Sequence, residues 1–171
     1  MLEKDYDPRI TEFLNKYAED KVPSIDAQTW FKDNKGLPPR TFQWYVREEL
    51  LPSPKLIEGR HHFYTKDEFR LLIDMVNVIQ ALKESTLIRF SMLKKVFGKY
   101  KDMRALVDQL LMLTEKWPIY KPDQGGEEAY YNNINDRVWK IAIERLGKGV
   151  DLDKFTIIDI EAEVMEKMPK L

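Results

Sequence analysis

The sequence predicts a mainly helical protein that carries one small β-hairpin in its N-terminal half. Apolar residues recur at helical spacing, as Phe42, Tyr45 and Val46 do at i, i+3 and i+4. Two short β-compatible runs flank Gly59, which can take the positive φ of a tight turn. A capping-box pattern at residues 65–68 starts a further helix. We therefore expect a helix-turn-helix with a small β wing, followed by a helical C-terminal region.

Composition limits the possible classes of protein. With 171 residues, 43 % hydrophobic and 12 % aromatic, the chain can bury a core as one domain or two small ones. It has no cysteine, which excludes disulfides, a catalytic thiol and a thiolate metal site. No run approaches the roughly 20 apolar residues of a membrane span, and the first residues lack the pattern of a signal peptide, so we expect a cytoplasmic protein.

The charge is distributed unevenly along the chain. The formal net charge is −1, but residues 21–70 carry +2 and the remainder carries −3. This asymmetry is small and has the sign expected if the region around residues 21–70 binds nucleic acid.

Residues 1–21 are predicted to hold one helix outside the helix-turn-helix. Asp7-Pro8 is a typical helix start, and Ile10, Phe13, Leu14 and Tyr17 then fall on one face of a helix that ends near residue 20. We expect this helix to pack on the neighbouring domain or on a partner subunit.

Residues 22–85 are predicted to form the helix-turn-helix and its wing. A helix over residues 24–33 buries Ala27, Trp30 and Phe31, and Gly36 lets the next helix start at a steep angle. That next helix covers residues 39–49 and buries the face with Phe42.

The opposite face of the helix over residues 39–49 is polar and exposed in this prediction. Arg40, Gln43, Trp44 and Arg47 lie at i, i+3, i+4 and i+7, which places two guanidinium groups, an amide and an indole side by side on solvent. The prolines at 52 and 54 end the helix.

The wing is predicted over residues 55–64. Residues 55–57 and 61–64 are short strands joined through residues 58–60, and a helix over residues 65–83 follows. Helix, basic hairpin and helix are together the outline of a winged helix.

At these residues the chain resembles the MerR-type family of bacterial transcription regulators. The likeness lies in Gly36-Leu37-Pro38-Pro39-Arg40-Thr41, Trp44-Tyr45, Leu50-Leu51-Pro52, Gly59, Tyr64-Thr65 and Asp67-Glu68-Phe69, and it covers about a third of the chain. In that family the helix equivalent to residues 39–49 enters the major groove and the hairpin lies against the phosphate backbone. The resemblance also implies a homodimer. The sequence departs from the family at three positions. Gln43 stands where arginine is usual, Trp44 where tyrosine is usual, and Glu49 where glycine is usual.

The resemblance and the residue types together predict the contacts with double-stranded DNA. Arg40 or Arg47 would read guanine and Gln43 would pair with adenine. Backbone contacts are expected from Thr41, Trp44, Arg60, Lys66 and one of the neighbours His61 and His62.

Residues 86–171 are predicted to be a helical dimerisation, effector or interaction region. Helices are expected from Ser91 to Gly98, over residues 102–116 and over residues 135–146. A loop at residues 121–126 separates the second of these helices from the third. Residues 155–160 fit either a strand or a helix. Tyr130, Tyr131 and Trp139 either line a pocket for a flat apolar ligand or form a second core.

No catalytic constellation, phosphate-binding loop or metal-ligand cluster is present in the sequence, so we expect neither an enzyme nor a bound cofactor or metal. His61 and His62 point to opposite faces of a strand and do not bind one metal together. The resemblance, together with the exposed face of residues 39–49, implies a sequence-specific DNA-binding transcription regulator. The alternative is a protein-interaction module on the same fold, which docks a partner through Trp44 and the aromatic C-terminal segment. A small-molecule sensor that binds ligand through those aromatics is a third possibility.

Overall fold

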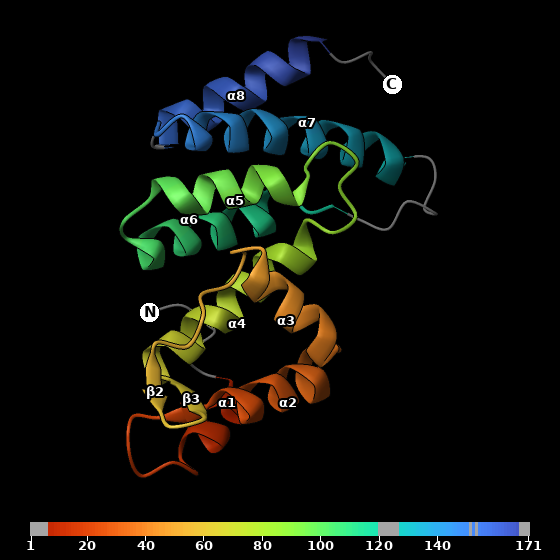
Figure 1. The fold of residues 1–171 in the computed structure, drawn as a ribbon. Coiled ribbons are helices and arrows are strands. Elements are labelled where there is room, and N and C mark those ends of the chain that lie inside the picture. Colours follow the sequence, from red (N-terminus) through yellow and green to blue (C-terminus); the bar gives the residue numbers. More distant parts are fainter. Residues whose placement is uncertain (1–6, 120–126, 151, 153, 168–171) are drawn as a thin grey trace. The chain divides into compact units, whose positions relative to one another are not determined.

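The structure is a computed structural model that describes residues 7–119, 127–150, 152 and 154–167. Within these residues the protein is mainly helical, with eight helices and a small three-stranded antiparallel sheet near the N-terminal end (Figure 1). The chain divides into two compact units, Met1–Val76 and Asn77–Leu171, which we call unit 1 and unit 2.

Helix α1 (Pro8–Leu14) starts as predicted, because the Asp7 carboxylate accepts a hydrogen bond from the backbone N–H of Arg9 at 3.0 Å. It ends six residues before the predicted end. After the helix, Tyr17 has partners elsewhere in unit 1, with its hydroxyl donating to Asp26 at 2.6 Å and its carbonyl accepting from Lys66 at 2.8 Å. Of the two predicted partners of this helix, the neighbouring winged-helix residues are the ones it contacts, since Phe13 lies 4.9 Å from Phe69 between ring centroids.

Helices α2 (Ser24–Lys35) and α3 (Pro39–Arg47) are joined by three residues. Gly36 has φ 62°, the left-handed conformation that the prediction required of it, and Leu37 is buried beside the turn. Phe42 and Tyr45 of α3 are buried as predicted, whereas Val46 is only half-buried.

Helix α3 ends two residues earlier than predicted, in a Schellman motif centred on Glu49. The N–H of Leu50 donates to the carbonyl of Tyr45 at 2.8 Å, and the N–H of Glu49 donates to Val46 at 3.1 Å. Glu49 has φ 61°, which favours glycine, and it is the only residue other than glycine with positive φ among those described. This is the position where the MerR-type pattern has glycine.

The sheet consists of β1 (Val22–Pro23), β2 (Leu56–Glu58) and β3 (His61–Tyr64), in the order β1-β3-β2. The β2–β3 hairpin was predicted and β1 was not. Val22 pairs with Tyr64 and Pro23 with Phe63. Proline is compatible with this place because β1 is an edge strand and Pro23 has no N–H to donate.

Helix α4 (Lys66–Ala81) begins with the predicted capping box. The N–H of Glu68 donates to the Thr65 hydroxyl at 3.0 Å, and the N–H of Thr65 donates to the Glu68 carboxylate at 2.9 Å. In unit 1 this helix presents Phe69 to a cluster of aromatic rings that also contains Phe13, Trp30, Phe31 and Phe42.

Unit 2 contains α5 (Phe90–Lys99), α6 (Met103–Lys116), α7 (Glu127–Gly147) and α8 (Lys154–Lys167). The prediction for α6 is confirmed to within one residue, and Asp102 caps the helix by accepting from the N–H of Ala105 at 3.1 Å. The predicted bounds of α5 were wrong, since the helix starts without a side-chain cap before Ser91 and continues through Gly98. The ambiguous segment at residues 155–160 is part of helix α8.

Helix α7 is longer than predicted and ends differently. Gly147 lies within the helix, and the left-handed residue is Gly149 with φ 82°. The N–H of Gly149 donates to Leu146 at 2.9 Å and the N–H of Val150 donates to Arg145 at 3.0 Å, which is again a Schellman motif.

A buried carboxylate holds the segment between α4 and α5. Asp136 of α7 is 6 % exposed and accepts from the Thr86 N–H at 3.0 Å and the Thr86 hydroxyl at 2.7 Å. It also accepts from the Ser85 hydroxyl, whose oxygen in turn accepts from the N–H of Ile88 at 2.9 Å. These bonds fix residues 85–88, where the sequence predicted only a break in the helix.

Tryptophans 117 and 139 form part of a second core in unit 2. Their rings meet edge to face at 5.8 Å, and the Trp139 indole N–H donates to the Trp117 carbonyl at 2.8 Å. Both side chains are buried, and neither is among the residues that line the two cavities of unit 2 described below. The Tyr130 and Tyr131 side chains and the loop predicted at residues 121–126 lie outside what is described.

Candidate nucleic-acid interface

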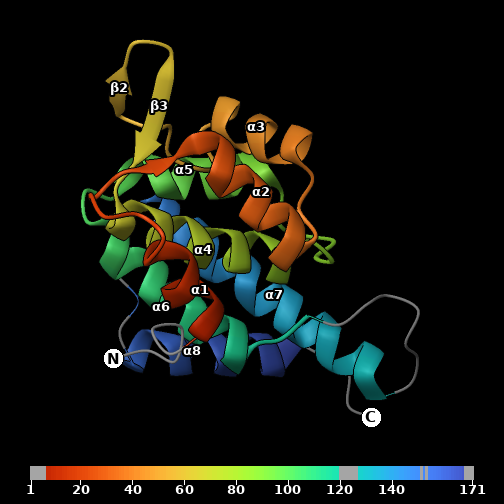
Figure 2. The ribbon, with the colours of Figure 1, turned by 90° about the horizontal axis from the view of Figure 1, so that it is seen from below.

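The predicted contact residues of α3 and of the β2–β3 hairpin come from one side of unit 1. Figure 2 shows α3 and the hairpin on the same side of α4, with α1 on the other side. Both elements contact α2, and their buried residues are Phe42 and Tyr45 from α3 and Tyr64 from β3. Their polar residues are therefore left on the outer surface.

The exposed face of α3 carries the side chains expected there. Arg40, Gln43 and Arg47 are exposed, Trp44 is 37 % exposed and Thr41 is half-buried. The indole of Trp44 lies 5.7 Å from the ring of Tyr45 between centroids, which supports it from the buried side of the helix. The helix thus presents two guanidinium groups and a partly exposed indole on a rigid element.

The amide of Gln43 is oriented by the preceding helix. Its Nε2 donates to Oε1 of Gln28 on α2 at 3.0 Å, and Nε2 of Gln28 donates to the Ser24 hydroxyl at 3.4 Å. One N–H and the carbonyl oxygen of Gln43 remain for another partner, which is the pair of groups needed to bind an adenine edge.

The hairpin has a two-residue turn. Glu58 pairs with His61 and Ile57 with His62, so Gly59 and Arg60 form the tip. Gly59 has φ 62° and Arg60 does not have positive φ, as in a type II′ turn, whose twist matches that of the strands. Arg60 is therefore held at the far end of the wing, and its side chain is exposed.

The two histidines are both exposed and lie on opposite faces of β3, as the sequence predicted. The ring of His61 is 6.4 Å from that of Phe63, two residues along the same face. Each imidazole is therefore available on a different side of the wing.

The base of the wing is fastened to the rest of unit 1. The Tyr64 hydroxyl donates to the Pro52 carbonyl at 2.9 Å, and burial of this phenol raises its pKa above the usual value. Lys21, which precedes β1, forms an ion pair with Glu58 of β2. These contacts limit the freedom of the hairpin relative to α3.

Lys66 is placed differently from the other predicted contacts. Its ammonium donates to the Tyr17 carbonyl at 2.8 Å and its N–H donates to Asp20 at 2.7 Å, in a half-buried position. Lys66 therefore joins the segment after α1 to the start of α4.

Two residues were missed by the sequence analysis. Lys55 is exposed directly before β2, and its place in the basic run of residues 55–64 was a signal that could have identified it. Gln28 could not have been identified in that way, because its contact with Gln43 depends on how α2 and α3 pack.

The described residues contain no group of three or more histidine, cysteine, aspartate or glutamate side chains placed to hold a metal ion. Among the helices described, none combines the length and apolar character that crossing a bilayer requires. Comparisons with protein family models, curated proteins and solved structures gave no match to this chain.

Proposed function

We propose that the protein is a sequence-specific DNA-binding transcription regulator with a winged helix-turn-helix in unit 1. The observation that carries the proposal is the common side of α3 and the β2–β3 hairpin, with Arg40 and Arg47 on the helix and Arg60 at the hairpin tip. A helix and a neighbouring hairpin with exposed arginines suit a duplex, because the helix fits the major groove while the hairpin reaches the phosphates beside it.

Each residue has a proposed role. Arg40 and Arg47 read guanine, and Gln43, oriented by Gln28, reads adenine. Thr41, Trp44, Lys55, Arg60 and one of the two histidines contact the phosphate backbone. Lys66 is left out of this set because its ammonium already donates to the Tyr17 carbonyl.

We further propose that two copies bind one site. The nine residues of α3 span about 13 Å and reach only a few base pairs, so one copy would read too short a sequence for high specificity. A homodimer on two half-sites doubles the sequence that is read and is the common arrangement for helix-turn-helix proteins.

The experiment is a binding titration with a mixed pool of duplex DNA over a series of salt concentrations. Arg47→Ala and Arg60→Ala are compared with the wild type and with Arg70→Ala. Arg70 is exposed on α4 in unit 1 and pairs with Asp67 at 3.2 Å, so it controls for loss of one guanidinium elsewhere. We expect affinity to fall steeply with salt and each test variant to lose roughly 1–3 kcal/mol of binding free energy.

The two test variants should differ in kind. Arg60→Ala should weaken binding to all sequences and lower the salt slope by about 1, whereas Arg47→Ala should relax the selection of one base. The regulator proposal fails if the wild type binds the pool no better than both variants at low salt.

A second candidate function has its own support in exposed apolar side chains. Trp44 on α3 and Leu56 and Ile57 on β2 are exposed, with Ile57 at 60 %. Side chains of this kind serve as anchors in protein interfaces, so the same surface could bind a protein instead of DNA. Absence of DNA binding in the titration above, together with full folding of the variants, would favour this function.

A further inference from the structure

Two adjoining cavities in unit 2 form a groove that the proposed DNA contact does not use. Each has a volume of about 460 Å³, and they share Thr86, Leu87, Lys140 and Glu144. We call the pair the α7 groove, because residues of α7 from Asn133 to Gly147, with Lys148 just beyond, line its length. At 1.5 Å per residue this length is about 22 Å.

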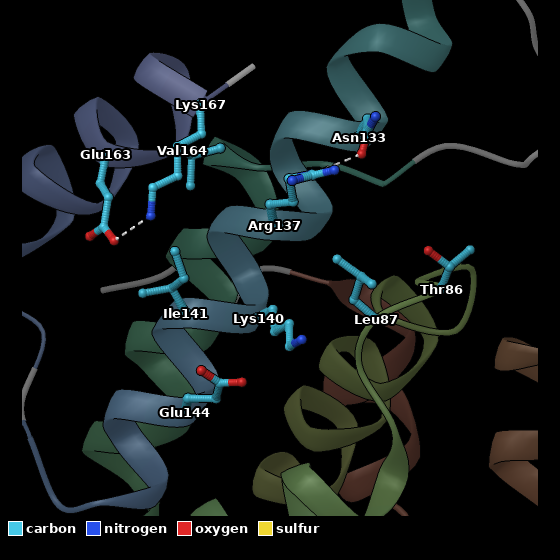
Figure 3. A pocket seen from close by; sticks show the side chains of 10 residues that line it. All are labelled: Thr86, Leu87, Asn133, Arg137, Lys140, Ile141, Glu144, Glu163, Val164 and Lys167. Carbon is cyan, nitrogen blue, oxygen red and sulfur yellow. Dashed lines mark hydrogen bonds and ion pairs between the residues drawn. The ribbon is translucent and has the colours of Figure 1, made fainter. Parts of the chain in front are cut away.

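The groove has a helical floor and two walls. Figure 3 shows Arg137, Lys140 and Ile141 of α7 between two sets of side chains. Val164 and Lys167 of α8 lie on one side, and residues 86–87 lie on the other. The second cavity continues along Met92 and Lys95 of α5.

The charge of the lining is strongly positive although the whole chain has a net charge of −1. Six cationic side chains line the groove against the two carboxylates of Glu144 and Glu163, and they are Arg89, Lys95, Arg137, Lys140, Lys148 and Lys167. Glu163 is itself neutralised by Lys167 at 3.3 Å and by Arg145 at 3.6 Å.

Most of these cations form no ion pair within the described part of the chain. Arg89, Lys95, Lys140 and Lys148 form no ion pair with any residue that the structure describes. Like charges gathered in a concave surface repel one another and attract an anionic ligand.

The floor between the cations is apolar. Leu87, Ile141 and Val164 line the first cavity, and Met92 and Ile143 line the second. No aromatic side chain is among the described lining residues, so the groove lacks the stacking surfaces that bind single-stranded nucleic acid. An occupant with both an apolar face and negative charges matches this surface.

We propose that the α7 groove binds an acidic amphipathic helix of a partner protein. Such a helix places apolar residues on Leu87, Met92 and Ile141, while its flanking carboxylates meet Lys95 and Lys140. The groove is about 22 Å long, which accommodates four turns of a helix. This length is greater than most small anions would occupy. The inference is independent of the proposed DNA contact, because it concerns other residues in the other unit.

The test uses the full chain and a fluorescein-labelled synthetic helix of about four turns, with leucine at i, i+3, i+4 and i+7 and glutamate on its flanks. The same helix with lysine in place of glutamate and an oligodeoxythymidine of equal charge are the comparison probes. Binding is measured by fluorescence anisotropy at low and physiological salt. Lys140→Glu is the test variant, because Lys140 is exposed and lines both cavities.

Lys101→Glu is the matched control, since Lys101 is exposed in unit 2 and lies outside the lining. We expect the acidic helix to bind and the lysine helix not to bind. Lys140→Glu should weaken binding by about tenfold and Lys101→Glu by less than about twofold. Arg47→Ala should leave this binding unchanged, so the two proposals can fail separately.

Several results would overturn the inference. One is an absence of binding by the acidic helix at low salt, and another is an equal loss of affinity in Lys140→Glu and Lys101→Glu. Tighter binding of the oligodeoxythymidine than of the peptide, if it is lost in Lys140→Glu and kept in Arg47→Ala, would instead assign the groove to nucleic acid.

Discussion

In unit 1 the rings of Phe13, Trp30 and Phe31 pack around Phe69, whereas in unit 2 the carboxylate of Asp136 is buried among hydroxyl and amide donors. The ring cluster stabilises unit 1 through apolar area and close packing, which depend on shape. The carboxylate stabilises unit 2 through hydrogen bonds, which depend on every partner being present. The two units should therefore respond to different kinds of substitution.

The two units also contain the same helix ending built from different residues. In unit 1 the Schellman motif of α3 has Glu49 in the left-handed position, and in unit 2 that of α7 has Gly149 there. The backbone hydrogen bonds are equivalent, so the two helix ends differ in which residue takes the positive φ.

Phe69→Ala should have the largest effect on stability. Phe69 is fully buried and contacts three rings, so its removal leaves a cavity and should lower the free energy of unfolding by about 3–5 kcal/mol. The amide hydrogen exchange rate, measured by mass spectrometry, should increase mainly in peptides from residues 7–76. Phe69→Leu is the control and should cost clearly less. An equal increase in both units would refute the view that this cluster serves unit 1.

Asp136→Ala should have the next largest effect, with about 3 kcal/mol lost, because it leaves the Thr86 N–H and two hydroxyl groups without their acceptor. Asp136→Asn keeps one acceptor oxygen and should cost about half as much. Urea unfolding measures the loss of unfolding free energy for the whole protein. Hydrogen exchange at residues 85–88 measures the loss of protection in that segment. Unchanged exchange at those residues in Asp136→Ala would show that the carboxylate does not hold the segment.

The smallest effects are expected at the two helix ends, and they should have opposite signs. Glu49→Gly should raise the free energy of unfolding by about 1 kcal/mol, because glycine adopts positive φ without strain. Gly149→Ala should lower it by about the same amount. An added Cβ at Gly149 meets no atom within 4 Å, so this loss would be conformational and not steric.

Glu48→Gly is the control for Glu49→Gly. Glu48 has φ −85°, which any residue adopts, so glycine there brings no relief and should be neutral or destabilising. The measurement is the thermal melting temperature of the wild type, Glu48→Gly, Glu49→Gly and Gly149→Ala. Equal effects of Glu48→Gly and Glu49→Gly would show that the positive φ costs nothing.

Features of the fold that depend on residues close together in the sequence were predictable. The capping box of Thr65 and Glu68, the turn at Gly36 and the buried face of α3 follow from patterns a few residues long. Strand β1 could not be predicted, because Val22 becomes a strand only by pairing with Tyr64, far along the chain. The contacts of Tyr17 after α1 were missed for the same reason, since its partners Asp26 and Lys66 lie further along the chain.

In the candidate site too, local features were predictable and contacts between elements were not. Helical spacing correctly predicted which side chains of α3 are exposed, and Gly59 correctly predicted the hairpin turn. The orientation of Gln43 by Gln28 and the engagement of Lys66 with Tyr17 depend on contacts between elements, which no local pattern encodes.

The distribution of the four tryptophans gives the protein a built-in optical probe. Trp30, Trp117 and Trp139 are buried, so a solute that quenches emission on collision reaches chiefly Trp44, on the outer face of α3. Any molecule that covers this face, whether DNA or protein, shields that indole from the quencher. Occupancy of α3 can thus be followed by intrinsic fluorescence, without a label and without disturbing the surface that is being studied.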